Sequence, residues 1–207
     1  ISSSDISSNS YNFITKDSLY NYLKLSKLIS DSLAIKYIDL GEIESKILEI
    51  PYVDEVLSFI DIESNFKLEI IEKKPIMDLK DYDFILSNKG EKIPKIDDLS
   101  LSIKSCFGNV DSIAFGDLAA LGNYISNDNF FINHIKYIYS DSTSFYFSVN
   151  DFDYNVKLGD LNRLENKLKK YKGFYAAKVN TDFLRKYNKL NLNFNNQVIA
   201  QKKEHGK

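Results

Sequence analysis

Few side chains in this 207-residue chain have the types and spacing that catalysis or metal binding requires. Cys106 is the single cysteine, so it cannot form an internal disulfide, and a zinc site would need several Cys or His ligands. Paired with His134, it could act as a thiol nucleophile beside a general base. Neither residue has a flanking catalytic motif, so we interpret His134 as a structural residue on a strand. His205, the other histidine, is placed in a terminal tail.

The carboxylates and glycines point to no catalytic site either. Asp151 and Asp153 flank a predicted turn, and turn formation explains them better than an acid–base pair does. Gly116 and Gly122 lack the Lys-Ser/Thr or third glycine that a phosphate-binding loop needs. We therefore predict a protein that is not an enzyme and that uses no cofactor and no metal. A hydrolase with dispersed carboxylates stays open as an alternative.

The composition excludes several other classes of protein. The chain has 27 basic and 29 acidic residues, whereas nucleic-acid-binding proteins usually carry a basic excess. The near-neutral charge also gives little long-range attraction to anionic lipids. Lys169, Lys170 and Lys172 form a short basic run that is typical of the solvated face of a helix. An apolar content of 43% excludes a disordered chain, and no stretch of about 18 apolar residues could cross a bilayer.

The first 80 residues read as a small α+β module. A serine-rich start with one short strand precedes Thr15, which is placed to cap a helix. A second helix follows Asp39 and must stop before Pro51, because proline disfavours helix in the residue before it. Residues 52–59 and 66–73 then have the composition of strands. The predicted order is strand, helix, helix, strand, strand, with a domain boundary at residue 80.

Residues 81–203 are predicted to form a larger, mainly antiparallel β domain with flanking helices, followed by a tail at 204–207. The two-residue link Asn195–Asn196 suits a tight hairpin between the last two strands, because Asn tolerates positive φ. The elements expected beyond Pro94 are helices at 118–125 and 161–175 and strands at 131–139, 144–149, 153–158, 190–194 and 197–203.

Two segments carry motifs that resemble a known family. Pro51 and Val53 follow the second helix, and Lys73, Lys74 and Pro75 close the strand that comes later. This arrangement is similar to the POTRA domain of the bacterial cell-division proteins FtsQ/DivIB. The later order of a strand ending in Leu-Gly, a helix and two closing strands resembles the β domain of the same family. The serine-rich start and the stretch 95–115 depart from the family pattern, and Ser87-Asn88 replaces its usual acidic residue.

The resemblance implies a non-enzymatic scaffold of the divisome. Such a protein binds FtsB/FtsL-like partners, called DivIC-like in some lineages, through its β domain and supports septum assembly. It is anchored in the cell inner membrane by a single helix, which we expect upstream of Ile1, and it places this region in the periplasm. The alternative is a POTRA-containing protein of outer-membrane protein assembly or of secretion.

The last predicted strand offers a way of binding such a partner. If it pairs only with the strand before it, its other side presents free N–H and C=O groups to a partner strand. Val198 and Ala200 would then face one way, and the intervening residues the other. The competing possibility is that residues 204–207 or the serine-rich start cover this edge. The predicted partner-binding residues are Gln197, Val198, Ile199, Ala200 and Gln201.

Overall fold

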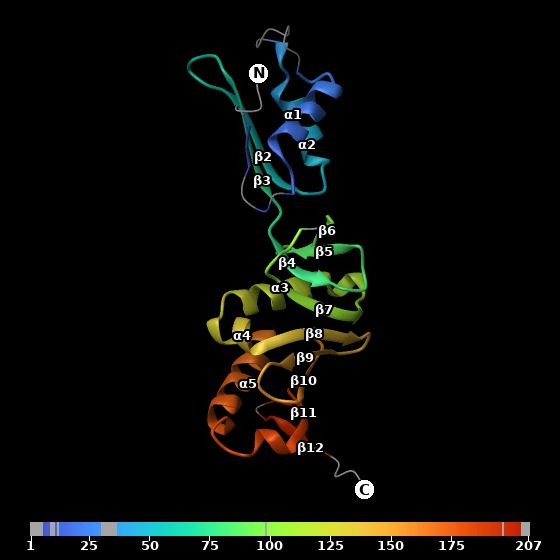
Figure 1. The fold of residues 1–207 in the computed structure, drawn as a ribbon, viewed down its shortest axis with the longest axis vertical. Helices are drawn as coiled ribbons and strands as arrows, with labels where there is room; N and C mark the ends of the chain where they lie inside the picture. The colour runs from blue at the N-terminus through green and yellow to red at the C-terminus, as the bar shows by residue number, and fades with distance from the viewer. Residues whose placement is uncertain are drawn as a thin grey trace. The chain divides into compact units, whose positions relative to one another are not determined.

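The computed structural model describes residues 6–8, 11, 13–29, 37–97, 99–195 and 197–203 (Figure 1). The chain divides into two compact units. We call residues 1–74 with 96–98 the N-terminal unit, and residues 75–95 with 99–207 the sheet unit. The predicted tail at 204–207, which includes His205, lies outside the described residues.

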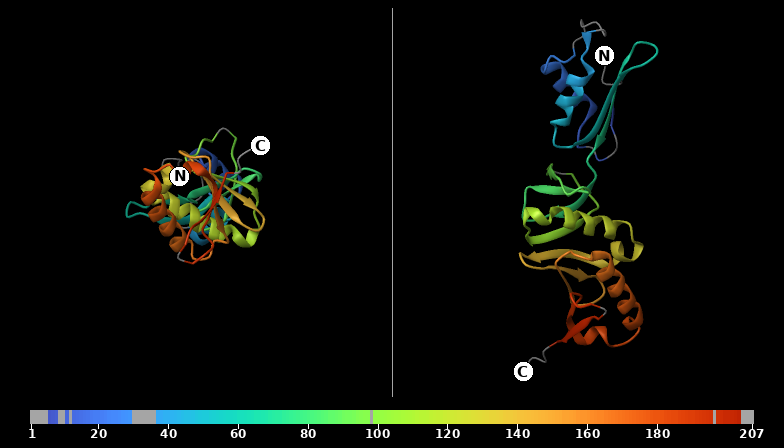
Figure 2. Two further views of the ribbon diagram at one scale, coloured as in Figure 1. Left: turned by 90° about the horizontal axis from the view of Figure 1, so that it is seen from below. Right: turned by 180° about the vertical axis from the view of Figure 1, so that it is seen from behind.

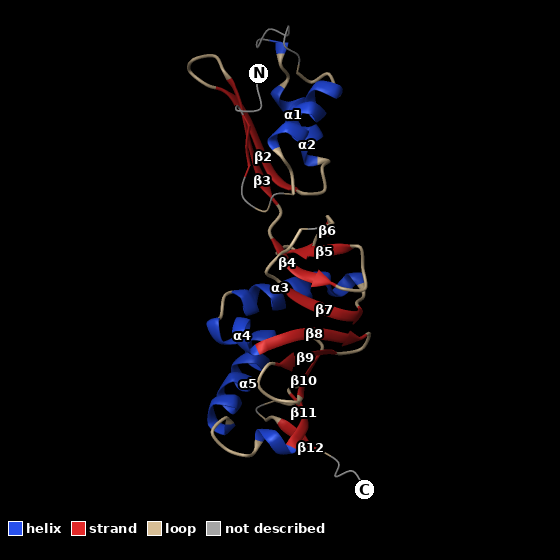
Figure 3. Cartoon of the chain, viewed as in Figure 1, coloured by secondary structure: helices blue, strands red, loops and turns tan. Residues whose placement is uncertain are grey.

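The N-terminal unit has the predicted order of strand, helix, helix, strand, strand. Its sheet runs in the order β1-β3-β2, with β1 parallel and β2 antiparallel to β3. Both helices lie on one side of this sheet (Figure 3). The elements are β1 (Ile6–Ser8), α1 (Lys16–Leu25), α2 (Leu40–Leu48), β2 (Val53–Ile60) and β3 (Phe66–Glu72).

Local sequence explains where these helices begin and which strand face is buried. The Thr15 hydroxyl accepts the backbone N–H of Ser18 at 3.1 Å and caps α1, and the Asp39 carboxylate caps α2 in the same way. Strand β3 alternates buried and more exposed residues, so one face meets the helices. The resulting core is formed by Ile6, Leu19, Leu23, Ile29, Ile43, Ile47, Val53, Phe66, Leu68 and Ile70.

The sheet unit is built on nine strands in the order β12-β11-β10-β9-β8-β7-β4-β5-β6. Five of the eight strand pairings are antiparallel, so the predicted α+β class with a mainly antiparallel sheet is confirmed. The strands are β4 (Pro75–Leu79), β5 (Phe84–Ser87), β6 (Lys92–Pro94), β7 (Lys104–Asn109), β8 (Ile135–Asp141), β9 (Phe145–Val149), β10 (Asn155–Gly159), β11 (Tyr187–Asn191) and β12 (Ile199–Lys202).

The helices of the sheet unit lie against one face of the nine-stranded sheet, as both side views show (Figures 1 and 2). Buried side chains from α3 and α5 complete a core with the inward residues of the strands, such as Phe147, Val156 and Leu190. The helices are α3 (Phe115–Ser126), α4 (Asn129–His134) and α5 (Leu164–Lys178), with short 3₁₀ turns at Ser112–Ala114 and Leu184–Lys186.

The units divide at Lys74 and Pro75, six residues before the boundary expected from the sequence. Pro75 closes the segment after β3, as expected, but it also opens β4. Strand β4 pairs with β5 and β7 of the sheet unit, so residues 75–79 belong to that unit.

Two segments of the sheet unit differ from their predicted structure. The expected strand at 131–139 begins as helix α4, because the Asp128 carboxylate accepts the N–H groups of Phe130 and Phe131 and caps a helical turn. His134 is therefore the last residue of a helix and does not lie on a strand. The stretch 95–115 matched the family pattern poorly, yet it supplies β7, which lies between β4 and β8 in the sheet.

Candidate functional site

Strand β12 lies at one end of the nine-stranded sheet and pairs only with β11. No other strand of the described residues pairs with its second side. Three of the five predicted partner-binding residues, Ile199, Ala200 and Gln201, lie within β12, and Gln197 and Val198 come directly before it. The structure therefore places all five on or beside an unpaired sheet edge.

The side chains of this edge alternate between the core and the solvent. Val198 and Ala200 are half-buried and pack against the hydrophobic core of the sheet unit. Gln197, Ile199 and Gln201 are exposed, and Ile199 keeps 43% of its surface accessible. This is the alternation expected for a strand with one face on the core. The inward pair holds the strand in place and leaves the outward residues free to make contacts.

The hydrogen bonds between β11 and β12 show which backbone N–H groups of β12 face its open side. Lys203 donates its N–H to the carbonyl oxygen of Lys186, on the β11 side, at 3.0 Å. The register shift between these strands falls on β11, so the alternation along β12 is unbroken. The direction of the backbone N–H alternates from residue to residue along a strand, so the N–H of Gln201, two residues before Lys203, also points toward β11. We infer that the N–H groups of Ala200 and Lys202 point to the open side.

The connection between β11 and β12 is longer than the tight hairpin predicted at Asn195–Asn196. Strand β11 ends at Asn191 and β12 begins at Ile199, so residues 192–198 join them. Leu192 donates its N–H to the carbonyl oxygen of Lys157 at 2.9 Å, so the chain stays beside β10 after β11 ends and does not turn back at once into β12. The Nζ of Lys170 donates to the carbonyl oxygens of Leu192 and Phe194. Lys170 therefore holds this loop through two hydrogen bonds, whereas the sequence predicted that it would lie on a solvated helix face.

The face of the sheet opposite the helices carries a row of side chains that leads to this edge. Phe107, Tyr139, Tyr146 and Lys157 are direct cross-strand neighbours on β7 to β10. The rings of Tyr139 and Tyr146 stack at 4.7 Å, and the ammonium of Lys157 lies 5.6 Å from the centre of the Tyr146 ring. The row passes through β11 to Ile199. A strand added to β12 would extend it.

The predicted POTRA motif residues flank the strands of the N-terminal unit. Pro51 is exposed in the turn after α2, and Val53 is buried at the start of β2. Lys73 and Lys74 form the short link between β3 and β4, and Pro75 is buried at the beginning of β4. In these positions the motif shapes the backbone between elements and does not form a cluster of functional groups.

The residues most able to do chemistry are deeply buried. Burial raises the pKa of the Cys106 thiol to about 12, so the thiol stays protonated and unreactive near neutral pH. Burial lowers the pKa of His134 to about 4, although the carboxylate of Asp151 opposes this shift. His134 forms a 2.6 Å hydrogen bond with the Tyr171 hydroxyl. Asp153 is exposed beside Lys203, as expected for a turn residue.

The sequence reasoning missed a charge imbalance around the edge strand. Residues 151–203 contain twelve Lys and Arg against five Asp and Glu, a net charge of +7, whereas the whole chain carries −2. The average over the chain therefore concealed a basic C-terminal quarter. A count of charge by segment would have shown it.

Among the described residues, every helix is too short or too polar to cross a lipid bilayer. In the same part of the chain, no three His, Cys, Asp or Glu side chains gather as a metal site would require.

Comparison with known proteins gives a family match over most of the sheet unit. No curated protein matches the chain. The family described as FtsQ/DivIB, C-terminal related, matches residues 74–201, which is more than half of the chain and nearly all of the sheet unit. The chain belongs to this FtsQ/DivIB C-terminal-related family, which indicates a role in cell division.

Proposed function

We propose that the protein is a non-enzymatic scaffold of the divisome that binds FtsB/FtsL-like, or DivIC-like, partners through β12 and supports septum assembly. The observation that carries this proposal is the unpaired edge of β12 in a sheet unit of the FtsQ/DivIB-related family. The order β-α-α-β-β of the N-terminal unit supports a POTRA domain. Such a protein would be anchored by one helix in the inner membrane, with this region in the periplasm.

Binding would proceed by addition of a partner strand to the sheet. The outward N–H groups of Ala200 and Lys202, with the carbonyl oxygens on the same side, would form the new ladder. Main-chain bonds of this kind give affinity with little dependence on partner sequence. Specificity would come from side chains that lie beside Ile199 and Gln201 on the open face.

The positive charge of residues 151–203 would add a second basis for selecting the partner. A net charge of +7 over residues 151–203 favours a partner segment that is acidic overall. Complementary charge speeds encounter and discriminates against basic competitors, with an effect that declines as salt is added.

A proline substitution on the open side tests the binding mode. In Lys202→Pro the residue loses its N–H, and the ring projects toward the incoming strand. We expect binding to an FtsB-like partner to weaken roughly tenfold, because a ladder hydrogen bond contributes about 1 kcal/mol and the ring adds a steric cost. Lys202→Ala is the matched control, since it removes the same charge and keeps the N–H. The measurement is a titration of purified partner by calorimetry.

If Lys202→Pro and Lys202→Ala bind equally well while both remain folded, β12 is not the binding edge. Co-purification of the membrane-anchored full-length protein from its source separates the two functions under consideration. Division proteins in the eluate would support the scaffold. Components of outer-membrane assembly or secretion would support the alternative, which the family match at 74–201 does not favour.

A further inference from the structure

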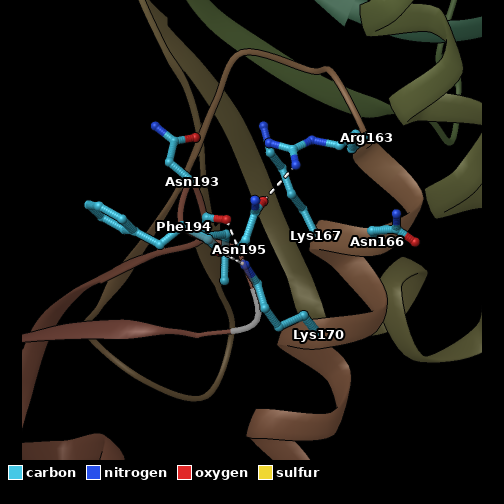
Figure 4. A pocket seen from close by; sticks show the side chains of 8 residues that line it. Arg163, Asn166, Lys167, Lys170, Asn193, Phe194 and Asn195 are labelled. Carbon is cyan, nitrogen blue, oxygen red and sulfur yellow. Dashed lines mark hydrogen bonds between the residues drawn. The ribbon is translucent and has the colours of Figure 1, made fainter.

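A polar pocket lies in the sheet unit between helix α5 and the loop at residues 192–195 (Figure 4). Its volume is about 500 Å³. None of its lining residues belongs to β12, which begins at Ile199. Its lining consists of Arg163, Asn166, Lys167, Lys170, Leu192, Asn193, Phe194 and Asn195.

Three of the lining residues are cations at the start of α5. Arg163 directly precedes the helix, with φ 54°, and Lys167 and Lys170, three positions apart, lie on the same side of the helix. Lys167 is buried and paired with the carboxylate of Asp160 at 2.6 Å. Within the described part of the chain, the hydrogen bond that Arg163 donates goes to the amide oxygen of Asn195, at 2.6 Å. The pocket therefore keeps an excess of two positive charges among the described residues.

The cations retain donors that the described protein does not use. The guanidinium of Arg163 has five N–H groups and uses one, and the ammonium of Lys170 uses two of three on neutral carbonyl oxygens. The pKa of Lys170 is lowered by burial first and then by the nearby charges of Lys167 and Arg163. An anion in the pocket would relieve this repulsion and accept the free donors.

The loop that lines the pocket is held by contacts from β10 and from α5. Gly159 has φ +70°, and a Cβ there would overlap the side chain of Asn193, so the loop packs directly against the end of β10. Lys170 fixes the carbonyl groups of the same loop. Donors that are positioned before the ligand arrives lose less conformational freedom on binding, which favours recognition of a small group.

We propose that this pocket is an oxyanion-binding site that takes a phosphate or carboxylate group. The planar guanidinium of Arg163 suits two-point contact with such groups, and the ammonium of Lys170 supplies a second charged donor from α5. Asn166, Asn193 and Asn195 add neutral amides, which orient an oxyanion without adding charge. The ligand could be a free phosphorylated molecule or an acidic segment of a polypeptide, and both share this chemistry.

The test is a titration of the full chain, labelled with ¹⁵N, with inorganic phosphate at low ionic strength. We expect saturable shifts in the amide signals of Arg163, Asn193 and Asn195. In Arg163→Gln the affinity should fall roughly fivefold or more, because a charged two-point contact is lost. Lys169→Gln is the matched control, since it removes one charge from α5 at a residue paired with Glu165 outside the pocket. Its affinity should stay within about twofold.

A second titration with a capped hexaglutamate peptide separates the two sources. Binding of the peptide and of phosphate at the same signals supports a site for acidic polypeptide segments. Binding of phosphate alone supports a site for a phosphorylated small molecule. Shifts that do not saturate with either probe, or an equal loss in Lys169→Gln, would overturn the proposal. Loss of partner binding in Lys202→Pro leaves this result unaffected, so the two proposals fail separately.

Discussion

The buried His134 shows how a residue with catalytic potential is used structurally. Its ring stacks on Phe130 at 4.6 Å and meets the edge of Tyr175, and its Nε2 hydrogen-bonds with Tyr171. The Tyr171 hydroxyl also forms a hydrogen bond with the Tyr154 hydroxyl, at 2.8 Å. This chain of three polar groups is enclosed by aromatic rings, where a charged imidazolium would be costly. The site therefore favours the neutral histidine.

The pH dependence of stability should report this burial. The pKa of His134 is about 4 in the folded state and about 6.5 when unfolded. Below pH 6.5 His134 binds a proton in the unfolded chain but stays neutral in the folded chain, so the free energy of unfolding falls as the pH falls toward 4. Between pH 7 and pH 5 we expect His134 to account for about 2 kcal/mol of the loss.

Urea unfolding of the wild type and of His134→Phe at pH 7, 6 and 5 measures this contribution. The aromatic surroundings can accept a phenyl ring, and Tyr171 keeps its bond to Tyr154. The wild type should lose more unfolding free energy than the variant over this range. Parallel pH profiles would mean that His134 is protonated in the folded state and that its burial is incomplete.

At the scale of elements, the pairing of β7 with β8 depends on a single glycine. Gly108 lies in β7 with φ +87°, and a Cβ there would overlap the carbonyl oxygen of Ser140 on β8. Its N–H donates to the carboxylate of Asp81 at 2.6 Å. Any other residue would meet both the backbone strain of a positive φ and the close approach of the neighbouring strand.

We expect Gly108→Ala to lower the free energy of unfolding by about 2–4 kcal/mol, from strain and displacement of β8. Gly173→Ala is the matched control, because Gly173 lies inside α5 and a Cβ there meets no atom within 4 Å. That change should raise stability by up to about 1 kcal/mol. Chemical denaturation measures both. Equal stability of Gly108→Ala and the wild type would show that β7 and β8 can separate to admit a side chain.

The elements also show what sequence patterns could and could not predict. Alternation in β3 and capping by Thr15 gave the N-terminal unit correctly, because both signals are local. The apolar run before Ile135 looks like a strand, but the cap at Asp128 makes it helical. Strand β7 has polar and small residues and is defined only by its neighbours in the sheet.

At the candidate site, too, the sequence predicted features that depend on local pattern and missed those that depend on distant contacts. The sequence predicted that the last strand would lie at an edge, and the residues of β12 follow the expected alternation. It could not predict the pocket, because Arg163 and Lys170 meet Asn195 only when α5 folds back onto the loop. Contacts between residues about 30 positions apart leave no periodic signal in a sequence.

At the scale of the whole chain, each of the two units has its own hydrophobic core. We expect them to unfold separately. Leu23 is fully buried in the core of the N-terminal unit, so Leu23→Ala should destabilise that unit by about 2–5 kcal/mol. Hydrogen exchange followed by mass spectrometry should show faster exchange in residues 37–74 and unchanged exchange in residues 104–191.

Leu118→Ala, at an equally buried position of the sheet unit, provides the reciprocal variant. It should accelerate exchange in 104–191 and leave 37–74 protected. If either variant accelerates exchange in both ranges, the units are energetically coupled and the chain unfolds as one body.

The two ends of the nine-stranded sheet are not equivalent. At the far end from β12 lies β6, which has three residues, and Pro94 at its end has no N–H to offer. We therefore expect the β12 end of this sheet to accept a further strand and the β6 end to resist one. A protein with two open ends can polymerise into fibres, whereas growth here would stop after one addition. Sheet pairing through this unit would thus give complexes of fixed stoichiometry, with one partner segment for each copy of the chain.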